Sequence, residues 1–267
     1  MKITPFLKWA GGKRWLVSSH KELFEFSFDR YIEPFVGSGS VFFHLNPAKA
    51  VLSDKNKRLI DVYRAIKMDW RLVYNNLSVH AKFHSKNYYY KIRASNFESI
   101  FERAAQFIYI NRTCWNGLYR VNKKGQFNVP IGTKDKVLLD TDNFEVISEI
   151  LGRTLLMNGD FEAAIDITKE GDLLFIDPPY TVNHNKNGFI KYNESIFSWD
   201  DQVRLSECVK RAKNRGAKII LTNADHESVS TLYADDFTTK TLPRASVLSG
   251  KSQFRGKVTE LLVLGNL

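Results

Sequence analysis

The stretch that most constrains this chain is an apolar run at residues 172–176 (DLLFI) followed by Asp177-Pro178-Pro179-Tyr180. A short apolar run bounded by a turn signal is typical of a strand buried on both faces, as in a parallel sheet. The two prolines end the strand, because neither can donate to a sheet ladder and each fixes its own φ. Asp177 and Tyr180 are therefore expected at the carboxyl end of a buried strand, the edge at which open α/β sheets bind ligands.

The four residues of this turn suit one chemistry, the activation of an exocyclic amine on a purine or a cytosine. The lone pair of such an amine is conjugated into the ring, so the amine is a poor nucleophile. A carboxylate and a backbone carbonyl can accept its N–H bonds and free the lone pair, while an aromatic face stacks on the base. The nitrogen can then attack a methyl donor directly. Taken alone, the four residues favour a simpler interpretation, a turn that ends a strand. The choice between this turn and a catalytic site depends on the other motifs.

The composition narrows the class of partner. The net charge of +10 indicates a polyanionic partner, nucleic acid first and an anionic membrane second. No apolar stretch is long enough to span a bilayer, and the N-terminus lacks the apolar region of a signal peptide. Cys114 and Cys208 make no disulfide framework, which favours a reducing cytoplasm. His80 and His84 lack a partner that would complete a metal set, so we interpret them as surface residues of a helix and expect no metal.

Two glycine-containing turns precede the central motif. Residues 8–13 (KWAGGK) combine paired glycines with cations that suit a carboxylate or phosphate, although an ordinary basic turn has the same pattern. Residues 31–43 predict a strand, a Gly-x-Gly turn and a helix, which allows backbone amides to approach a ligand. A second strand at residues 50–54 ends in Asp54, which suits either a ribose hydroxyl pair or the N-cap of a helix beginning near Asn56.

The middle of the chain changes in character. Periodic apolar residues predict packing helices at 56–80 and 97–111. Residues 111–130 are instead rich in Arg, Lys, Asn, Gly and aromatic residues, with turn signals at Asn116-Gly117 and Lys124-Gly125. Cations can pair with phosphates, an arginine can fork to guanine, and a planar ring can wedge into a base stack. This composition favours a nucleic-acid contact over a surface hairpin without function.

The last part alternates strands and helices. A helix is expected at 143–151 and a strand at 154–157, followed by Asp160-Phe161, which suits either a ligand adenine or an N-cap with a core phenylalanine. A helix at 200–215 closed by Gly216 and strands at 217–222, 237–242 and 258–264 follow. Residues 249–257 form a basic loop, either solvated or a second DNA contact. This alternation predicts a mostly parallel α/β sheet.

The joint occurrence and order of five motifs resembles the Dam-type DNA adenine-N6 methyltransferases (D12 class, alpha group). The motifs lie at residues 8–13 (KWAGGK), 35–39 (FVGSG), 116–122 (NGLYRVN), 127–130 (FNVP) and 177–180 (DPPY). The resemblance covers essentially the whole chain. It implies a Rossmann-like S-adenosylmethionine-dependent methyltransferase sheet with an inserted, mainly helical DNA-recognition domain that carries a β-hairpin. The catalytic domain would comprise residues 1–55 and 143–267, and the insert residues 56–142.

The resemblance also implies roles for individual residues. Trp9 and Lys13 would contact S-adenosylmethionine, Asp54 its ribose, and Asp160-Phe161 its adenine. The catalytic residues would be Asp177, Pro178, Pro179 and Tyr180, which hold a target adenine extruded from the duplex. The cofactor-binding residues would be Trp9, Lys13, Phe35, Gly37, Gly39, Asp54, Asp160, Phe161 and Asp177.

The insert would supply the DNA contacts. Trp115 matches a residue that wedges into the DNA stack, and Arg120 matches a guanine-reading arginine of GATC, the usual target of the family. Residues 131–135 (IGTKD) depart from the aromatic and basic continuation common in the family, which affects part of the base readout. The DNA-binding residues would be Trp115, Asn116, Tyr119, Arg120, Asn122, Lys123, Lys124, Asn128 and Pro130.

Other functions compete with this one. Within the transferases the alternatives are methylation of cytosine N4, of RNA or of a protein amide, and cytosine is the strongest, although Asp rather than Asn opens the Pro-Pro motif. A DNA-binding protein that has lost catalysis is the alternative from another class. The expected partner is double-stranded DNA, with no membrane and no metal, and the expected state is a monomer. We expect it in the cytoplasm, on the nucleoid or encoded by a phage in a bacterial host.

Overall fold

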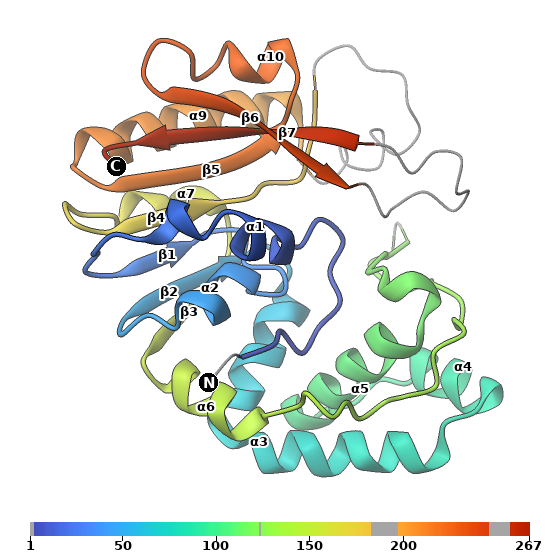
Figure 1. The fold of residues 1–267 in the computed structure, drawn as a ribbon. Helices are drawn as coiled ribbons and strands as arrows, with labels where there is room; N and C mark the ends of the chain where they lie inside the picture. Colours follow the sequence, from blue (N-terminus) through green and yellow to red (C-terminus); the bar gives the residue numbers. More distant parts are fainter. Residues whose placement is uncertain (1–2, 123, 183–196, 246–256) are drawn as a thin grey trace. The chain divides into compact units, whose positions relative to one another are not determined.

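The computed structural model of the chain describes residues 3–122, 124–182, 197–245 and 257–267 (Figure 1). These residues divide into two compact units. One comprises Met1–Glu25, Val36–Ala48 and Asp54–Gly159, and the other Phe26–Phe35, Lys49–Ser53 and Asp160–Leu267. Lys123 and residues 249–256 of the predicted basic loop lie outside the described residues.

The described strands form one seven-stranded sheet with the order β3-β2-β1-β4-β5-β7-β6. Strand β1 pairs in parallel with β2 and β4, and β4 pairs in parallel with β5. Strand β7 runs antiparallel to β5 and β6. The prediction of a mostly parallel sheet is confirmed. The strands are β1 (Tyr31–Glu33), β2 (Ala50–Asp54), β3 (Thr154–Asn158), β4 (Leu173–Ile176), β5 (Lys218–Ala224), β6 (Thr238–Ala245) and β7 (Lys257–Gly265).

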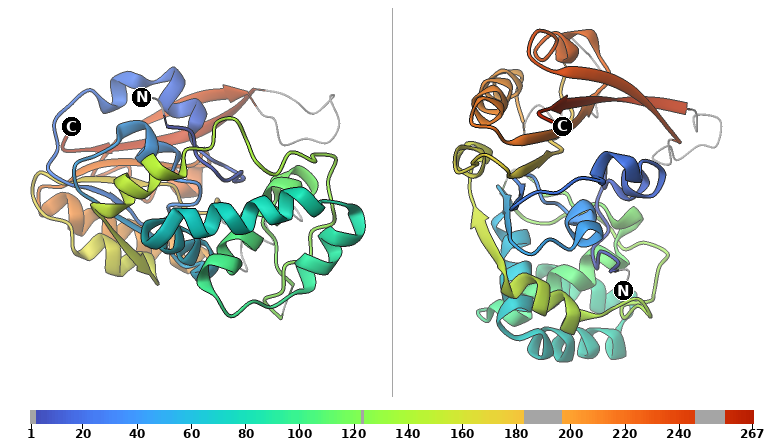
Figure 2. Two further views of the ribbon diagram at one scale, coloured as in Figure 1. Left: turned by 90° about the horizontal axis from the view of Figure 1, so that it is seen from below. Right: turned by 60° about the vertical axis from the view of Figure 1, so that its left-hand side comes forward.

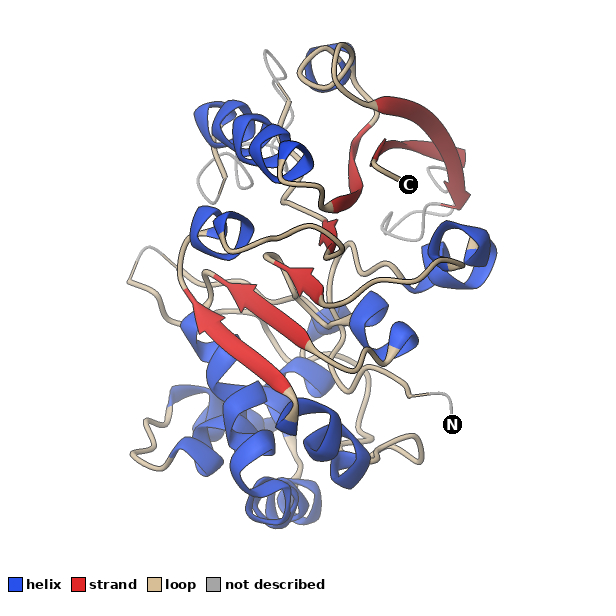
Figure 3. Ribbon diagram, turned by 90° about the vertical axis from the view of Figure 1, so that its left-hand side faces the viewer, coloured by secondary structure: helices blue, strands red, loops and turns tan. Residues whose placement is uncertain are grey.

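In the second unit, helices lie on one side of the strands that carry the central motif. Helix α7 (Phe161–Asp166) contacts β1, α9 (Trp199–Asn214) contacts β5, and the two helices pack against each other (Figure 3). The four residues of β4 are all buried, as the apolar run predicted. Helix α9 begins at a capping box of Ser198 and Asp201, which satisfies amides that the first helical turn leaves open. The short helix α10 (Glu227–Ser230) follows β5.

The first unit is mainly helical, and α3, α4 and α5 lie together in it (Figure 2). The expected packing helices at 56–80 and 97–111 are confirmed as α3 and α5, and α3 is interrupted at Asp69. Helix α4 was not expected, because its three consecutive tyrosines leave only Tyr89 and Ile92 buried and hide the helical period. The helices are α1 (Arg14–Ser19), α2 (Ser40–Leu45), α3 (Lys57–Phe83), α4 (Lys86–Ala94), α5 (Ile100–Thr113) and α6 (Phe144–Gly152), with 3-10 turns at Lys21–Phe24 and Trp115–Gly117.

The interpretation of His80 as a surface residue is wrong. Its ring is buried, its Nδ1 lies 2.9 Å from the Tyr88 hydroxyl, and it packs against Tyr109. Burial lowers the pKa of His80 to about 4, so the ring is neutral at neutral pH. The error follows from missing α4, because α4 supplies Tyr88. His84 is half-buried, with its Nδ1 2.8 Å from the Tyr109 hydroxyl.

Two absences hold for the described ranges. No helix there is long and apolar enough to cross a membrane. No group of three or more His, Cys, Asp or Glu side chains there is arranged to hold a metal ion.

Candidate active site

The central motif begins where β4 ends. Asp177 follows Ile176 directly, and Ile176 pairs with Leu221 of β5, so Thr222 is next to Asp177 across the ladder. The Thr222 hydroxyl donates a hydrogen bond to Asp177 Oδ1 at 3.0 Å. Asp177 is half-buried, whereas Thr222 is fully buried. The predicted position of the carboxylate, at the carboxyl end of a buried strand, is confirmed.

Two tyrosines lie near this carboxylate in the second unit. Burial raises the pKa of the half-buried Tyr180 well above its usual value, and the negative charges of Asp177 and Glu260 raise it further. Burial likewise raises the pKa of Tyr31, with smaller contributions from Glu33 and Asp177. Both phenols are therefore neutral over the physiological range, and Tyr180 presents an uncharged ring beside the carboxylate.

Three phenylalanines form an aromatic cluster in the same unit. The Phe35 and Phe161 rings stack at 5.5 Å, and the Phe197 ring meets Phe35 edge-on at 5.6 Å. The guanidinium carbon of Arg204 lies 4.2 Å from the centroid of the Phe161 ring. Phe161 is buried, as one of the two sequence interpretations expected.

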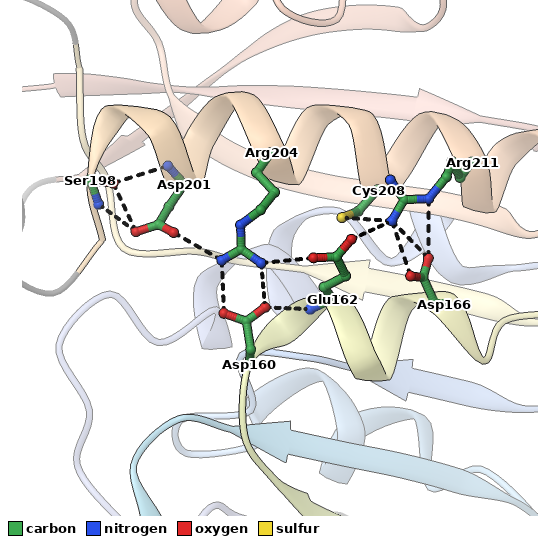
Figure 4. Close-up of polar contacts among 8 residues, drawn as sticks. All are labelled: Asp160, Glu162, Asp166, Ser198, Asp201, Arg204, Cys208 and Arg211. Atoms are coloured by element: carbon green, nitrogen blue, oxygen red, sulfur yellow. Dashed lines mark hydrogen bonds and ion pairs between the residues drawn. The ribbon is translucent and has the colours of Figure 1, made fainter.

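Asp160 belongs to a charged network between α7 and α9 (Figure 4). Its Oδ1 accepts the Glu162 backbone amide, which makes Asp160 the N-cap of α7. Its two carboxylate oxygens accept a guanidinium fork from Arg204 at 2.6 and 2.8 Å. The capping role is therefore confirmed, and binding of a cofactor adenine stays a prediction.

The same network continues along α9. Arg204 also pairs with Glu162 and Asp201, both at 3.0 Å (Figure 4). Arg211, two turns further on, pairs with Glu162 at 2.7 Å and with Asp166 at 3.1 Å. Two arginines of α9 thus alternate with carboxylates of α7. Of these two arginines, Arg204 is the one that pairs with Asp160.

The glycine turn lies in the first unit and depends on the close approach of Trp9. Gly37 has a φ of +47° and Gly39 a φ of +64°, both in the left-handed region. A Cβ added to Gly37 would lie 2.7 Å from the Trp9 ring, so no larger residue fits there without displacing it. The Tyr63 hydroxyl donates to the Gly37 carbonyl at 3.0 Å. The expected strand, turn and helix are confirmed by β1, this turn and α2.

Asp54 is tied to this turn. Its Oδ2 accepts the Gly37 amide at 3.2 Å and its Oδ1 the Asn56 amide at 2.9 Å. The N-cap of α3 is Asn56, whose side chain accepts the Leu59 amide, so the alternative role of Asp54 as that cap is wrong. Desolvation raises the pKa of Asp54 to about 6, against the opposing effect of the two amides.

Trp9 and Lys13 lie in different surroundings within the first unit. Trp9 is half-buried and stacks on Tyr119 at 5.7 Å, and Tyr119 stacks in turn on Phe107 at 5.1 Å. Lys13 is buried, and its ammonium donates to the Gly11 carbonyl at 2.9 Å. Tyr119, expected to contact DNA, is thus a link between Trp9 and the core of α5.

The basic segment forms a compact turn with mostly exposed side chains. Asn122 Oδ1 accepts the amides of Lys124 and Gln126, and Arg120 Nε donates to Asn128 Oδ1 at 2.8 Å. The Trp115 side chain is 50% exposed, which leaves its ring available for a stacking partner. Where the β-hairpin was expected, the described residues form two isolated antiparallel bridges, Val121 with Phe127 and Cys114 with Ile131, and no strand. Two of the residues expected to contact DNA, Tyr119 and Asn128, are half-buried. The other described ones are exposed, namely Trp115, Asn116, Arg120, Asn122, Lys124 and Pro130.

Sequence reasoning missed several residues that hold these segments. Arg112, counted within the basic segment, is fully buried and forks to Asp142 at 2.7 and 2.6 Å, so it cannot pair with a phosphate. Asn111 bonds both the amide and the carbonyl of Lys8 at 2.9 Å, which attaches the first motif to α5. Nothing local in the sequence indicates these partners, because about a hundred residues separate Lys8 from Asn111.

Comparison with known proteins identifies the family. A family model described as D12 class N6 adenine-specific DNA methyltransferase matches residues 9–249. The chain is 38% identical to the type II methyltransferase M1.LlaDCHI of Lactococcus lactis subsp. cremoris, over 98% of this chain and 95% of that protein. It is 36% identical to the type II methyltransferase M.MjaIII of Methanocaldococcus jannaschii, over 99% of each chain. It is 31% identical to a DNA adenine methylase of Vibrio cholerae, over 98% of this chain and 96% of that protein.

These matches confirm the resemblance that the sequence motifs indicated. The family model spans most of the chain, and the relatives align along nearly their whole length. The description of the family specifies adenine and so argues against cytosine as the target base. The chain is therefore an enzyme that belongs to the D12 class of N6 adenine-specific DNA methyltransferases.

Proposed function

We propose that this enzyme transfers a methyl group from S-adenosylmethionine to N6 of adenine within GATC in duplex DNA. The observation that carries the proposal is the Asp177 carboxylate, held at the end of buried β4 by Thr222 and followed by Pro178, Pro179 and the neutral Tyr180. S-adenosylmethionine supplies an electrophilic methyl group when it is bound. Asp177 and a proline carbonyl accept the N–H bonds of the adenine amine, and Tyr180 stacks on the extruded base.

The residues of the first unit fit parts of this cofactor. Asp54 offers a carboxylate that suits two ribose hydroxyls, and Lys13 offers an ammonium that suits a carboxylate. Trp9 offers a half-buried aromatic face beside the Gly37 turn. The proposal also assigns Phe35, Asp160 and Phe161 of the second unit to cofactor binding, with Asp160 and Phe161 contacting the cofactor adenine.

We further propose that residues 56–142 form the DNA-recognition part and residues 1–55 and 143–267 the catalytic part. The mostly exposed side chains of residues 115–122 and 124–130 support this division. The net charge of +10 of the whole chain supports a nucleic-acid partner. Trp115 would wedge into the base stack, Arg120 would fork to a guanine, and Lys123 and Lys124 would bind phosphates. The enzyme would act as a monomer in the cytoplasm of a bacterial host, on the nucleoid or encoded by a phage.

The direct test of this function is transfer of a labelled methyl group from S-adenosylmethionine to unmethylated duplex DNA. Asp177→Ala should lower the transfer rate by at least about a hundredfold, since general acid–base and amine-activating groups contribute on the order of 10²–10⁴-fold. Its affinity for duplex DNA should stay within about twofold of the native value, because Asp177 acts on a base already extruded.

The matched control is Asp225→Ala, which removes an exposed carboxylate just beyond β5 and changes the net charge equally. It should transfer methyl groups at the native rate. Near-normal turnover by Asp177→Ala would remove Asp177 from the reaction.

A further inference from the structure

A layer of fully buried polar residues lies beneath the Asp177 motif in the second unit. We propose that Thr222 is a positioning residue that fixes the Asp177 carboxylate, and that Gln202 and Asn223 fix the backbone of the loop that follows it. All three side chains are 0% exposed. The proposal deepens the proposed function and rests on the role given there to Asp177.

Thr222 acts on the carboxylate itself. Its hydroxyl lies 3.0 Å from Asp177 Oδ1 and 3.5 Å from the Ile176 carbonyl, so its shorter contact is with the carboxylate of the motif. A hydroxyl has one proton to donate, and a β-branched side chain has a stiff χ1 torsion. Thr222 therefore offers the carboxylate a partner in one fixed direction. Burial raises the pKa of Tyr180, and a hydrogen bond from Thr222 lowers it by a smaller amount, so Thr222 also acts on the tyrosine of the motif.

Gln202 and Asn223 act on the backbone. The Gln202 carbonyl oxygen accepts from the Asn223 amide at 3.0 Å. The Gln202 amide nitrogen lies 3.3 Å from the Thr181 carbonyl and 3.5 Å from the Pro179 carbonyl. These carbonyls flank Tyr180 on both sides. The pair thus ties the loop at the position of the aromatic ring to α9 and to β5.

The composition of β5 argues that these polar groups have a purpose beyond stability. Ile219, Ile220 and Leu221 fill the strand with apolar side chains, and similar residues would fill the next two positions at less cost. Buried polar groups have to be satisfied, and satisfied networks specify one geometry rather than adding much net stability. Amine activation needs such a geometry, because a misplacement of about 1 Å at a reacting centre costs on the order of a hundredfold in rate.

Two pairs of variants isolate the hydroxyl of Thr222. Thr222→Val removes the hydroxyl at nearly constant volume, and Thr222→Ser and Thr222→Ala differ by the hydroxyl after the methyl group is lost. Single-turnover methyl transfer should fall about tenfold from Thr to Val and again from Ser to Ala, the size expected for a hydrogen bond to a charged group. Affinities for S-adenosylhomocysteine and for duplex DNA should stay within about twofold.

The other arm of the experiment concerns the loop. Gln202→Met keeps the length of the side chain and removes the amide, so the transfer rate should fall while the two affinities hold. Ser206→Ala is the matched control, because Ser206 is a buried polar residue of α9 whose hydroxyl donates to the Val203 carbonyl. It should transfer at the native rate.

Equal transfer rates within both Thr222 pairs would overturn the positioning role. A second result would also overturn it. If the transfer rate, both affinities and the melting temperature fell together, and Thr222→Ser restored none of them, Thr222 would only support the fold. Asp177→Ala keeps the two proposals distinguishable. If Asp177→Ala retains turnover, the proposed function fails, whereas failure of the Thr222 variants alone leaves it standing.

Discussion

At the scale of single residues, Asp54 shows how a local motif acquires its chemistry from the fold. Two roles were expected for Asp54, and the structure removes the capping role because Asn56 caps α3. Desolvation and two backbone amides act in opposite directions on its carboxyl group, and desolvation prevails, raising the pKa to about 6. An acid with a raised folded-state pKa contributes stability that is present below its unfolded pKa of about 3.8 and is lost as the pH rises through about 6.

Cofactor binding should depend on pH in the opposite sense. The ionised carboxylate is the stronger acceptor for ribose hydroxyls, so affinity for S-adenosylhomocysteine should fall as the pH drops through about 6. Asp54→Asn should bind more weakly and lose this pH dependence. Calorimetric titration from pH 5 to pH 8 measures both quantities. An identical pH profile in Asp54→Asn would assign the dependence to another group and remove Asp54 from the ribose site.

At the scale of elements, helices and strands could be predicted from the sequence, whereas the ion pairs between α7 and α9 could not. The sequence predicted a helix at 200–215 closed by Gly216, which is α9, and predicted β4 from its apolar run, because a helix end and a buried strand each leave a local pattern. The ion pair between Arg204 and Asp160 could not be predicted, because about forty residues separate them. The charge of a residue does not identify which opposite charge it will contact. The role of Thr222 could not be predicted either, because its hydroxyl acquires a function only through its contact with Asp177, which is far away in the sequence.

Variants of two arginines of α9 test whether Asp160 and Phe161 bind the cofactor. Arg204→Met should remove the guanidinium from the Asp160 carboxylate and from the Phe161 ring. It should weaken S-adenosylhomocysteine binding by about threefold to tenfold, as for loss of about 1 kcal/mol. Arg211→Met removes an exposed arginine of the same helix that pairs with Glu162 and Asp166 of α7, and this variant should bind normally. Calorimetry on both variants gives the comparison. Equal affinities would confine Asp160 and Phe161 to their structural roles.

At the scale of the whole molecule, the order of the motifs carried more information than any one of them. Residues 8–13, 35–39 and 177–180 each have an ordinary structural interpretation, yet together with the 116–130 segment they indicated the family that the comparisons identify. The sheet, its buried strands and the polar edge at Asp177 were predictable in this way. The burial of His80 and Arg112 was not, because His80 packs against Tyr88 of the unexpected helix α4 and Arg112 pairs with Asp142, thirty residues further along the chain.

The most direct test of the central claim is single-base mapping of methylation on unmethylated genomic DNA incubated with the enzyme and S-adenosylmethionine. N6-methyladenine is expected at the adenine of GATC on both strands, with no mark in a parallel incubation without enzyme. Methylated adenine in another sequence would contradict the GATC assignment and place the readout outside the role given to Arg120. Methyl groups on cytosine N4, or no transfer to DNA, would contradict the proposed function of methyl transfer to adenine N6.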